Sequence, residues 1–306
     1  SFGHLLINAQ MKYSFMQAHE KEFSIERMSC VFKVSRSGYY RFISATPSAR
    51  RIENMRLLEE IKAIHHGSRQ VYGSPRIHAQ LHMQGEVCSR KRVARLMKTV
   101  GLQAKMKRRF KVTTQVDLLA KKAPNLLQQN FVSDRPNQRW VADITYVATA
   151  EGWLYVAAIL DLFSRRIVGL AMNERMTTEL VKSALKQAIT HRRPDKGLIH
   201  HSDKGCQYTS HAFQQELTLY NIVCSMSGAG NCYDNAAMES FFHTLKTEHI
   251  YFESYVTREQ AKQSIFEYVE IFYNRKRSHS TLGYLSPMVF EKKWYQQQNV
   301  FLPSVH

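Results

Sequence analysis

The order of strand-like and helix-like stretches in the second half of the chain limits its fold more than any other feature. Three stretches rich in aromatic and β-branched residues follow one another with hairpin-like connections, and helices and strands then alternate. This order predicts an α/β domain with a mixed sheet. The expected strands are Arg139–Val147, Trp153–Leu162, Arg166–Met172, Gly197–Ser202 and Ile222–Ser225, and the expected helices are Thr178–His191, Ser210–Tyr220 and Asp234–Glu248.

The first half of the chain has helical patterns separated by turns. Two short stretches with a turn between them predict a helix-turn-helix, and a long amphipathic stretch follows. A turn marked by glycine and proline then precedes two more helices. The expected helices are Ser24–Phe32, Val34–Phe42, Ile52–His65, one from the turn Tyr72–Arg76 to about His82, and Ser89–Val100.

Ser89–Val100 is the clearest of these helices. Ser89 is a suitable N-cap, and Gly101 is a suitable C-terminal stop. Its apolar residues recur with helical spacing and predict one buried stripe. The members of that stripe are Val93, Leu96, Met97 and Val100.

A second face of the same helix is cationic. Lys91, Arg95 and Lys98 lie on it, and Arg92 is beside them. A short helix with one buried stripe and one cationic face suits the second helix of a DNA-binding helix-turn-helix. The alternative is an ordinary solvated surface helix.

The net charge of +18 indicates a polyanionic partner. Residues 1–130 hold 24 Lys and Arg against 8 Asp and Glu, whereas residues 131–306 hold 19 against 17. No apolar run reaches the roughly 18 residues of a membrane span, and no signal peptide is visible, which favours nucleic acid over a membrane surface. The basic run 105–111 is either a phosphate-contacting arm or a solvated linker.

Five cysteines form no paired CxxC motif, which argues against both a zinc site and a disulfide framework. Their odd number and wide spacing suit a reducing compartment. We therefore expect a cytoplasmic protein. The cysteines are Cys30, Cys88, Cys206, Cys224 and Cys232.

Three carboxylates lie where strand ends and a helix could bring them together. Asp143 is inside the first expected strand, Asp203 ends the fourth, and Glu239 is on the last helix. Carboxylate oxygens are the ligands that hard cations such as Mg²⁺ prefer, and two such ions can support in-line displacement at phosphorus. Many chains contain some Asp–Asp–Glu spacing, so the three residues alone are a weak signal.

The helix that carries Glu239 adds to this signal. Glu239, His243 and Lys246 follow helical spacing on one face, beside a second, apolar face. A carboxylate and a lysine two turns apart could reach a metal ion and a DNA phosphate, although Lys246 could also be an ordinary surface lysine. The apolar face is formed by Met238, Phe241, Phe242 and Leu245.

Several motifs in sequence order resemble those of the OrfB-type transposases of the IS-three insertion-sequence family, relatives of retroviral integrases. The resemblance runs from about Ile52 to Trp294, and 59 and 35 residues separate the three carboxylates. The motifs are Tyr72-Gly-Ser-Pro-Arg-Ile77, Ser89-Arg-Lys-Arg-Val-Ala-Arg-Leu-Met97, Trp140-Val-Ala-Asp-Ile-Thr-Tyr146, His201-Ser-Asp-Lys-Gly205, Gly230-Asn-Cys-Tyr-Asp-Asn-Ala236, Glu239-Ser-Phe-Phe242, Tyr273-Asn-Arg-Lys-Arg277 and His279-Ser-Thr-Leu-Gly-Tyr-Leu-Ser-Pro287.

The resemblance implies a ribonuclease H-like catalytic core preceded by an all-α helix-turn-helix region. It implies Asp143, Asp203 and Glu239 as catalytic ligands of Mg²⁺, with two ions and with Mn²⁺ as a substitute. It also implies Lys246 as a contact to the transposon end. Two small departures are Ala142, where threonine is expected, and Ala229, where a basic residue is frequent.

Three further acidic or imidazole side chains lie near these motifs. We interpret Asp161 and His243 as supporting residues of the acidic site. We interpret Asp234 as the cap of the helix that carries Glu239.

The predicted function is Mg²⁺-dependent cleavage of DNA at insertion-sequence ends and strand transfer into target DNA. Positioning and charge stabilisation carry such a reaction, so no Ser, Tyr or Cys nucleophile is needed. Two alternatives stay open at this stage. One is a catalytically inactive DNA-binding regulator derived from a transposase, and the other is a nuclease of the same fold without joining activity.

The predicted domains and partners follow from the same reading. The expected partners are terminal inverted repeats and target DNA, a further copy of the chain on DNA, and an OrfA-type protein from an upstream frame, with no membrane. We expect a bacterial, nucleoid-associated location. Ser1 is not a Met, which suggests equally a frameshift fusion junction or a trimmed chain. The expected segments are a helical segment 1–50, a DNA-binding domain 51–111, a linker 112–135, a catalytic core with a helical extension 136–295, and a tail 296–306.

Overall fold

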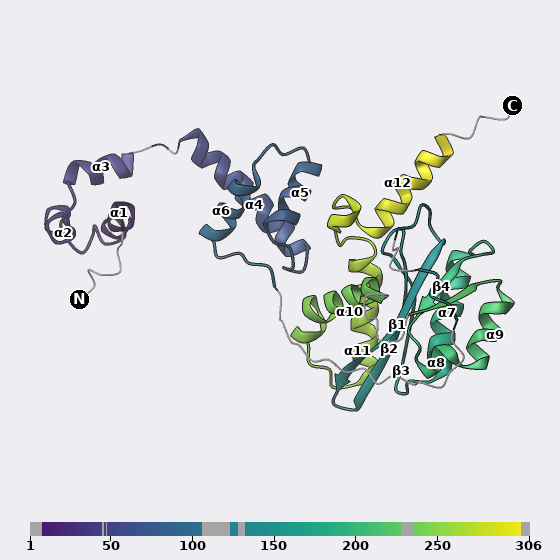
Figure 1. Cartoon of the computed structure of the whole chain (residues 1–306). Coiled ribbons are helices and arrows are strands. Elements are labelled where there is room, and N and C mark those ends of the chain that lie inside the picture. Colours follow the sequence, from purple (N-terminus) through teal and green to yellow (C-terminus); the bar gives the residue numbers. More distant parts are fainter. Residues whose placement is uncertain are drawn as a thin grey trace. The chain divides into compact units, whose positions relative to one another are not determined.

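The computed structural model describes residues 8–44, 46, 48–105, 123–127, 132–227 and 235–300. It contains two compact units, Ser1–Glu60 and Ile61–His306 (Figure 1). Most of the basic run 105–111, much of the linker 112–135, Ala229, Asp234 and the end of the tail lie outside the described residues. No helix in the described part of the chain is both long and apolar enough to cross a bilayer.

The first unit contains three short helices packed around a small core. The helix-turn-helix expected from residues 24–42 is confirmed, and Lys33 makes the turn in a left-handed conformation with φ of 52°. The helix before it was not predicted; it starts at Asn8, whose side chain accepts from the Met11 backbone N–H. The helices are α1 (Ala9–Ala18), α2 (Ile25–Phe32) and α3 (Arg36–Ser44), and the core residues are Met16, Met28 and Tyr39.

The second unit begins within α4 (Ala49–Gly67) and continues into α5 (Ser74–Met83) and α6 (Arg90–Thr99). The expected ends of α6 are confirmed. Ser89 Oγ accepts from the Arg92 backbone N–H at 3.2 Å, and Gly101 ends the helix with φ of 71°.

The apolar stripe of α6 was predicted correctly except at its last member. Val93, Leu96 and Met97 are buried, whereas Val100 is 40% exposed. Val100 is the C-cap residue, so its side chain no longer follows the helical stripe. One further turn of helix would have been needed to bury it.

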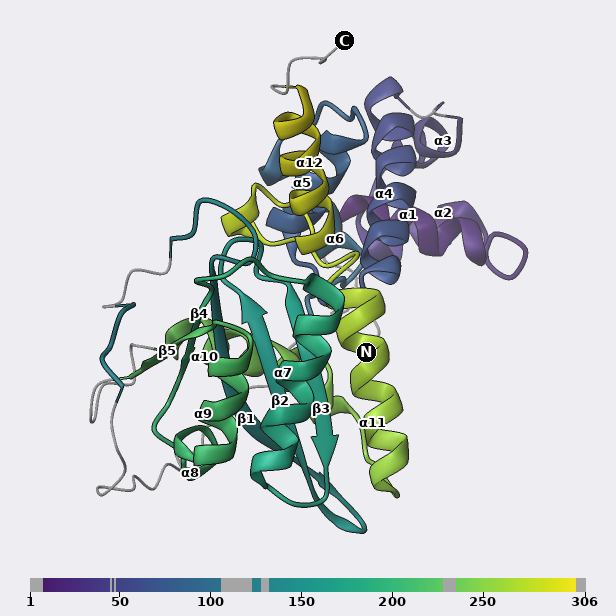
Figure 2. The ribbon, with the colours of Figure 1, turned by 90° about the vertical axis from the view of Figure 1, so that its right-hand side faces the viewer.

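A five-stranded mixed sheet forms the centre of the second unit, with the strand order β3-β2-β1-β4-β5 (Figures 1 and 2). The first three strands are antiparallel neighbours, and β4 and β5 run parallel to β1. This topology confirms the predicted ribonuclease H-like fold. The strands are β1 (Arg139–Thr149), β2 (Gly152–Asp161), β3 (Ile167–Asn173), β4 (Ile199–Ser202) and β5 (Val223–Met226).

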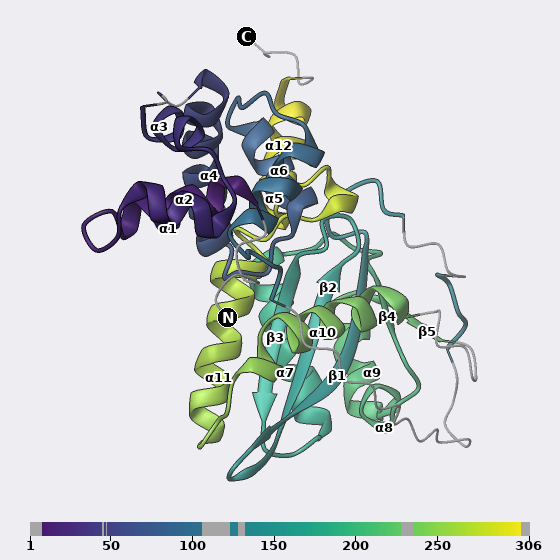
Figure 3. The same ribbon diagram turned by 90° about the vertical axis from the view of Figure 1, so that its left-hand side faces the viewer.

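Helices cover both faces of this sheet (Figures 2 and 3). On one face the main core packs around Trp140, Leu185 and Phe213, all at most 1% exposed. The opposite face carries the helix with Glu239. The helices of the first face are α7 (Thr178–Arg192), α8 (Cys206–Thr209) and α9 (His211–Leu219), and those of the second are α10 (Ala236–Glu248) and α11 (Arg258–Phe266).

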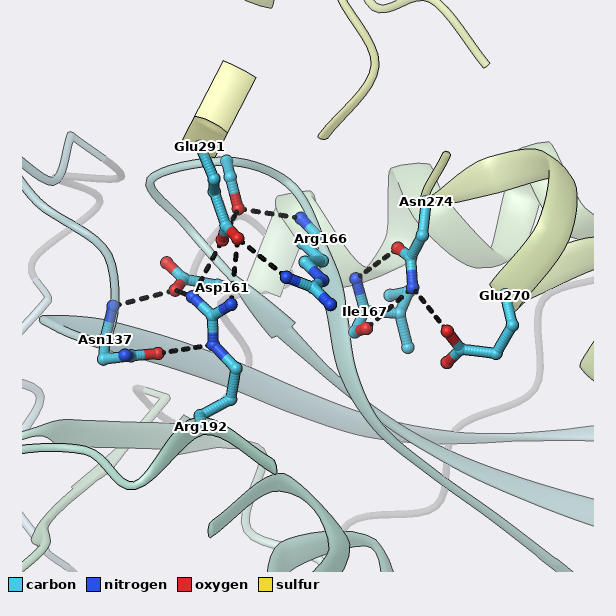
Figure 4. Close-up of polar contacts among 9 residues, drawn as sticks. Asn137, Asp161, Arg166, Ile167, Arg192, Glu270, Asn274 and Glu291 are labelled. Atoms are coloured by element: carbon cyan, nitrogen blue, oxygen red, sulfur yellow. Dashed lines mark hydrogen bonds and ion pairs between the residues drawn. The ribbon is translucent and has the colours of Figure 1, made fainter. Parts of the chain in front are cut away.

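A C-terminal extension wraps back onto the sheet; the sequence predicted a helical extension within 136–295 but did not locate its individual helices. Glu291 anchors it by hydrogen bonds to Ser164, Arg166 and Arg192 at 2.7–2.9 Å (Figure 4). Asn274 adds a second anchor, because its side-chain amide bonds both the N–H and the carbonyl of Ile167 at 2.9 Å (Figure 4). The elements are η3 (Ile250–Phe252), η4 (Glu267–Tyr273), η5 (Ser280–Leu282) and α12 (Pro287–Val300).

Candidate active site

Asp143 lies in the middle of β1, the central strand of the sheet. One of its carboxylate oxygens accepts a hydrogen bond from the Ile144 backbone N–H at 2.7 Å. Burial raises the pKa of Asp143 to about 7, and the charges of Asp203 and Glu239 add to the increase. Asp203 and Glu239 therefore both lie close enough to Asp143 to act on its carboxylate electrostatically.

Asp203 follows β4 directly and lies beside Asp143. Arg139 pairs with Ile199 and Val141 with His201, and extending this register by two residues places Asp203 opposite Asp143. The Asp203 carboxylate accepts from the Gly205 backbone N–H at 3.0 Å, and burial raises its pKa. Two acidic side chains thus meet because adjacent parallel strands bring their residues into register.

The third carboxylate and the predicted lysine come from α10. Glu239 and His243 are exposed, and Lys246 is partly buried. The Lys246 ammonium lies 5.1 Å from the centre of the Tyr146 ring. Burial lowers the pKa of Lys246, while Tyr146 and Asp143 act to raise it, so the lysine is near the acidic pair.

The chemistry of this donor set fits a hard divalent cation, because all three side chains offer carboxylate oxygens. Within the described residues, no three Asp, Glu, His or Cys side chains are already gathered as closely as a complete metal site requires.

Asp161, which we expected to support this site, belongs to a different network. It pairs with Trp140 in the sheet register, three residues along β1 from Asp143. Its carboxylate accepts from the backbone N–H groups of Asn137 and Phe163 at 2.8 and 3.0 Å, and Arg192 is 3.4 Å away. Its contacts hold together the start of β1 and the end of α7 (Figure 4).

Sequence reasoning missed the side chains that hold the strand end before Asp203. The His201 ring lies between two hydroxyls, with Nδ1 2.8 Å from Ser225 Oγ and Nε2 3.2 Å from Ser227 Oγ. These contacts join the ends of β4 and β5, and Asn235 adds a hydrogen bond from its amide to the Ala142 carbonyl at 3.3 Å. His201 and Asn235 stand in motifs noted in the sequence, but nothing local indicated which groups their side chains would contact.

The cationic face of α6 is directed away from the core of its own region. Lys91, Arg95 and Lys98 are exposed, and Arg92 is partly buried. These residues therefore lie on a surface that a large polyanion could reach, which is the property a DNA-binding face needs.

Comparison with known proteins decides the family. Two models described as integrase core domain match residues 133–232 and 239–294, and one described as HTH-like domain matches residues 53–110. The chain is 48% identical over 269 residues to the 31 kDa protein of insertion element IS600 from Shigella sonnei, covering 88% of this chain and 99% of that protein. The chain belongs to the OrfB-type transposases of the IS3 family.

Other members of the family match over a similar length. Transposase InsF of insertion sequence IS3A from Escherichia coli (strain K12) is 41% identical over 285 residues, which cover 92% of this chain and 99% of that protein. As a member of the family, this OrfB-type transposase is a DDE-type enzyme that acts on DNA strands.

Solved structures are more distant. The catalytic core of HTLV-2 integrase in complex with magnesium is 18% identical with a TM-score of 0.42, and covers 52% of this chain and 99% of its own. That likeness is too low to carry an argument about this transposase.

Proposed function

We propose that Asp143, Asp203 and Glu239 are the catalytic carboxylates with which this transposase cleaves insertion-sequence ends and joins them to target DNA. The observation that carries this proposal is the parallel register of β1 and β4, which extends to put Asp203 opposite Asp143, with the charge of Glu239 acting on Asp143 from α10. Such an arrangement is costly in an empty fold and becomes favourable when a cation is present.

The proposed cofactor is Mg²⁺, with two ions and with Mn²⁺ as a substitute. When bound, the ions supply charge stabilisation at the attacked phosphate and a more reactive attacking oxygen. The role of the protein chain is to hold the three carboxylates on rigid elements of the fold. Asp143 is fixed by its strand, Asp203 by the hydrogen bond from Gly205, and Glu239 by α10.

Lys246 is proposed to bind a phosphate of the transposon end. Its ammonium stands near Tyr146 and Asp143, so DNA that reaches the acidic site also reaches this cation. His243, one turn before Lys246 on an exposed position of α10, is proposed to support the same contact.

The face of α6 with Lys91, Arg92, Arg95 and Lys98 is proposed to bind DNA backbone phosphates at a distance from the chemistry. Phosphate contacts position a protein on DNA but carry little sequence information. The segment boundaries expected from the sequence, with a DNA-binding domain at 51–111 and a catalytic core at 136–295, remain predictions.

Sequence-specific recognition of the ends is proposed to need an OrfA-type upstream protein and assembly of several copies on DNA. Alone, the chain should discriminate poorly between true ends and random DNA in competition gel shifts, and fusion to the upstream frame should improve discrimination sharply. Strong end specificity of the chain alone would refute this part. A cytoplasmic, nucleoid-associated location is proposed on the same grounds.

The direct test is incubation of the chain with labelled terminal inverted repeats and Mg²⁺, followed by analysis of the DNA products. Cleavage that frees a 3′-OH, and joining of pre-cut ends to target DNA, are the expected results. Binding without cleavage would favour the inactive regulator, and cleavage without joining of pre-cut ends would favour a plain nuclease.

A further inference from the structure

A cavity of about 370 Å³ lies against α10, the helix that carries Glu239 and that we call the catalytic helix after its proposed role, and positive charge dominates the cavity wall. This volume is in the roughly 300–1,000 Å³ range of ligand sites in proteins. Three arginines from distant parts of the second unit line it: Arg76 from α5, Arg165 from the connection between β2 and β3, and Arg277 after η4. Among the described residues, no carboxylate lines this cavity.

Only part of the arginine charge is balanced. Glu248 accepts hydrogen bonds from Arg277 at 2.7 and 2.8 Å, and Arg76 is 3.4 Å from the same carboxylate. In the described part of the chain, Arg165 has no hydrogen bond or ion pair to an acidic side chain, and its partial burial lowers its pKa. Glu248 thus offsets part of the charge of Arg277 and Arg76, and the charge of Arg165 adds to what remains.

The three positive charges converge on His279, which also lines the cavity. Burial, followed by the charges of Arg277, Arg76 and Arg165, lowers the pKa of His279 to about 2. The histidine is therefore neutral, first because it is desolvated and then because three arginine charges act on it. A partly buried excess of cations is unfavourable unless an anion accompanies it.

Other groups in the wall suit an anion with several oxygen atoms. Ser240 and Thr244, four residues apart on α10, place hydroxyls on one face of that helix, and Thr281 adds a third. The first turn of α10 also forms part of the wall, and its N-cap Asn235 makes no side-chain capping bond. The helix dipole favours an anion at such an N-terminus.

Arg165 reaches the cavity from a conformation that is rare for its residue type. Its φ is 60°, in the left-handed region that L-residues other than Asn and Asp seldom occupy. A glycine or asparagine would fit this turn with less strain. The fold thus retains a strained arginine where its side chain adds positive charge to the cavity.

We propose that this cavity, which we call the arginine pocket, binds a backbone phosphate of the DNA substrate beside the catalytic helix. This rests on the proposed function, since Glu239 and Ser240 are consecutive on α10 and so direct their side chains to neighbouring faces. DNA held by one phosphate in the pocket would be anchored to the helix that carries Glu239. Arginine suits this task because its planar guanidinium matches phosphate oxygens.

The test measures DNA binding by the full chain in a chelating buffer, so that cleavage plays no part. Arg165→Gln should weaken binding to a fluorescent duplex and reduce the slope of log affinity against log salt by about 0.9. Arg165→Lys should keep most of the slope. Arg175→Gln, an equal charge change at an exposed arginine of the same unit, should leave the slope unchanged.

A second pair of variants, at Thr281, tests the proposal even if Arg165→Gln does not fold. Thr281 is exposed at the pocket, so Thr281→Glu should fold normally and reduce the slope, whereas the neutral Thr281→Gln should not. If well-folded Arg165→Gln and Thr281→Glu proteins both keep the wild-type slope, the proposal is overturned.

Inorganic phosphate provides the second arm of the experiment. If Arg165→Gln abolishes binding of inorganic phosphate, detected by ³¹P line broadening, but leaves the DNA slope intact, the pocket serves a small anion and its assignment to DNA is overturned. A chain that shows the Arg165-dependent slope but cannot cleave terminal repeats with Mg²⁺ would instead refute only the proposed function.

Discussion

The two ends of α10 lie beside carboxylates in opposite electrostatic surroundings. Near its first turns, Asp143 is partly buried, and desolvation together with the charges of Asp203 and Glu239 raises its pKa to about 7. At its last residue, burial acts to raise the pKa of Glu248, but the hydrogen bonds and charge of Arg277 lower it overall. Tyr268 also donates to Glu248 at 3.0 Å.

The difference separates Glu248, whose pKa is lowered by a neighbouring arginine, from Asp143, whose pKa is raised. Glu248 has its counter-charge inside the protein, so its ion pairs hold the C-terminal extension and α5 to the catalytic helix. Asp143 has two carboxylates as well as Lys246 near it, and the proposed cation would balance the remaining negative charge. Substitution of the two acids should therefore affect different properties, activity in one case and stability in the other.

The largest expected effect is on catalysis, at the end of α10 near Asp143. Asp143→Asn, Asp203→Asn and Glu239→Gln should each reduce Mg²⁺-dependent cleavage by at least about a thousandfold, since each removes a charge that would hold the metal. DNA affinity in a chelating buffer should remain nearly unchanged. Initial rates on labelled terminal repeats measure the first property, and fluorescence anisotropy measures the second. Substantial cleavage by any one variant would exclude that residue as a required ligand.

The next effect is on stability, at the end of α10 where Glu248 pairs with Arg277. Glu248→Gln should lower the free energy of unfolding by about 3–5 kcal/mol, because it leaves the buried Arg277 without its counter-charge. The matched control is Glu259→Gln, which removes an exposed acid paired with Lys262 at 3.1 Å and should cost no more than about 1 kcal/mol. Urea denaturation of both variants gives the comparison. Equal losses in the two proteins would mean that the pairing of Glu248 has no special structural weight.

A smaller effect sharpens the comparison through pH. The folded-state pKa of Asp143, about 7, is above its unfolded value, so stability from this group is present at low pH and is lost as pH rises through 7. In metal-free buffer, Asp143→Asn should match the wild type near pH 4 and exceed it at pH 8 by an amount on the order of 1–3 kcal/mol. Thermal melts across this range measure the gap, and added Mg²⁺ should stabilise only the wild type. A gap that does not widen with pH would contradict the assigned pKa.

The sequence predicted the sheet and the helices α7, α9 and α10 because their apolar periodicity is local. The meeting of Asp143 and Asp203 was expected from their places at strand ends and from the family resemblance, because strand patterns alone do not say which strands are neighbours. Asp161 could not be excluded from the site, because its partner Arg192 is distant in sequence. The sequence around Asp161 does not indicate its contacts with Asn137 and Arg192, which only the structure shows.

The C-terminal extension illustrates a second limit. Helix α12 is anchored by Glu291 through Ser164, Arg166 and Arg192, and none of these pairings leaves a periodic pattern in the sequence. The arginine pocket was hidden in the same way, because its wall combines residues from α5, the β2–β3 connection, α10 and the segment after η4. Motif positions such as Arg76 and Arg277 were noted as matches to the family, but their common partner Glu248 was not.

The smallest expected effect concerns exposed cations, because their removal leaves no buried charge without its counter-charge. Replacing Lys91, Arg95 and Lys98 on α6 with alanine should reduce the salt slope of DNA binding by about 0.9 for each phosphate contact that is lost. The matched control replaces the exposed Arg175, Lys292 and Lys293 and removes the same charge from the region of the catalytic core. Both triple variants should melt close to the wild type, because exposed charges contribute little to stability. Fluorescence anisotropy over a series of salt concentrations measures the slopes. Equal changes in slope would show that only net charge matters and that α6 has no distinct role on DNA, whereas a larger change from the α6 variant would assign it a docking face separate from the arginine pocket.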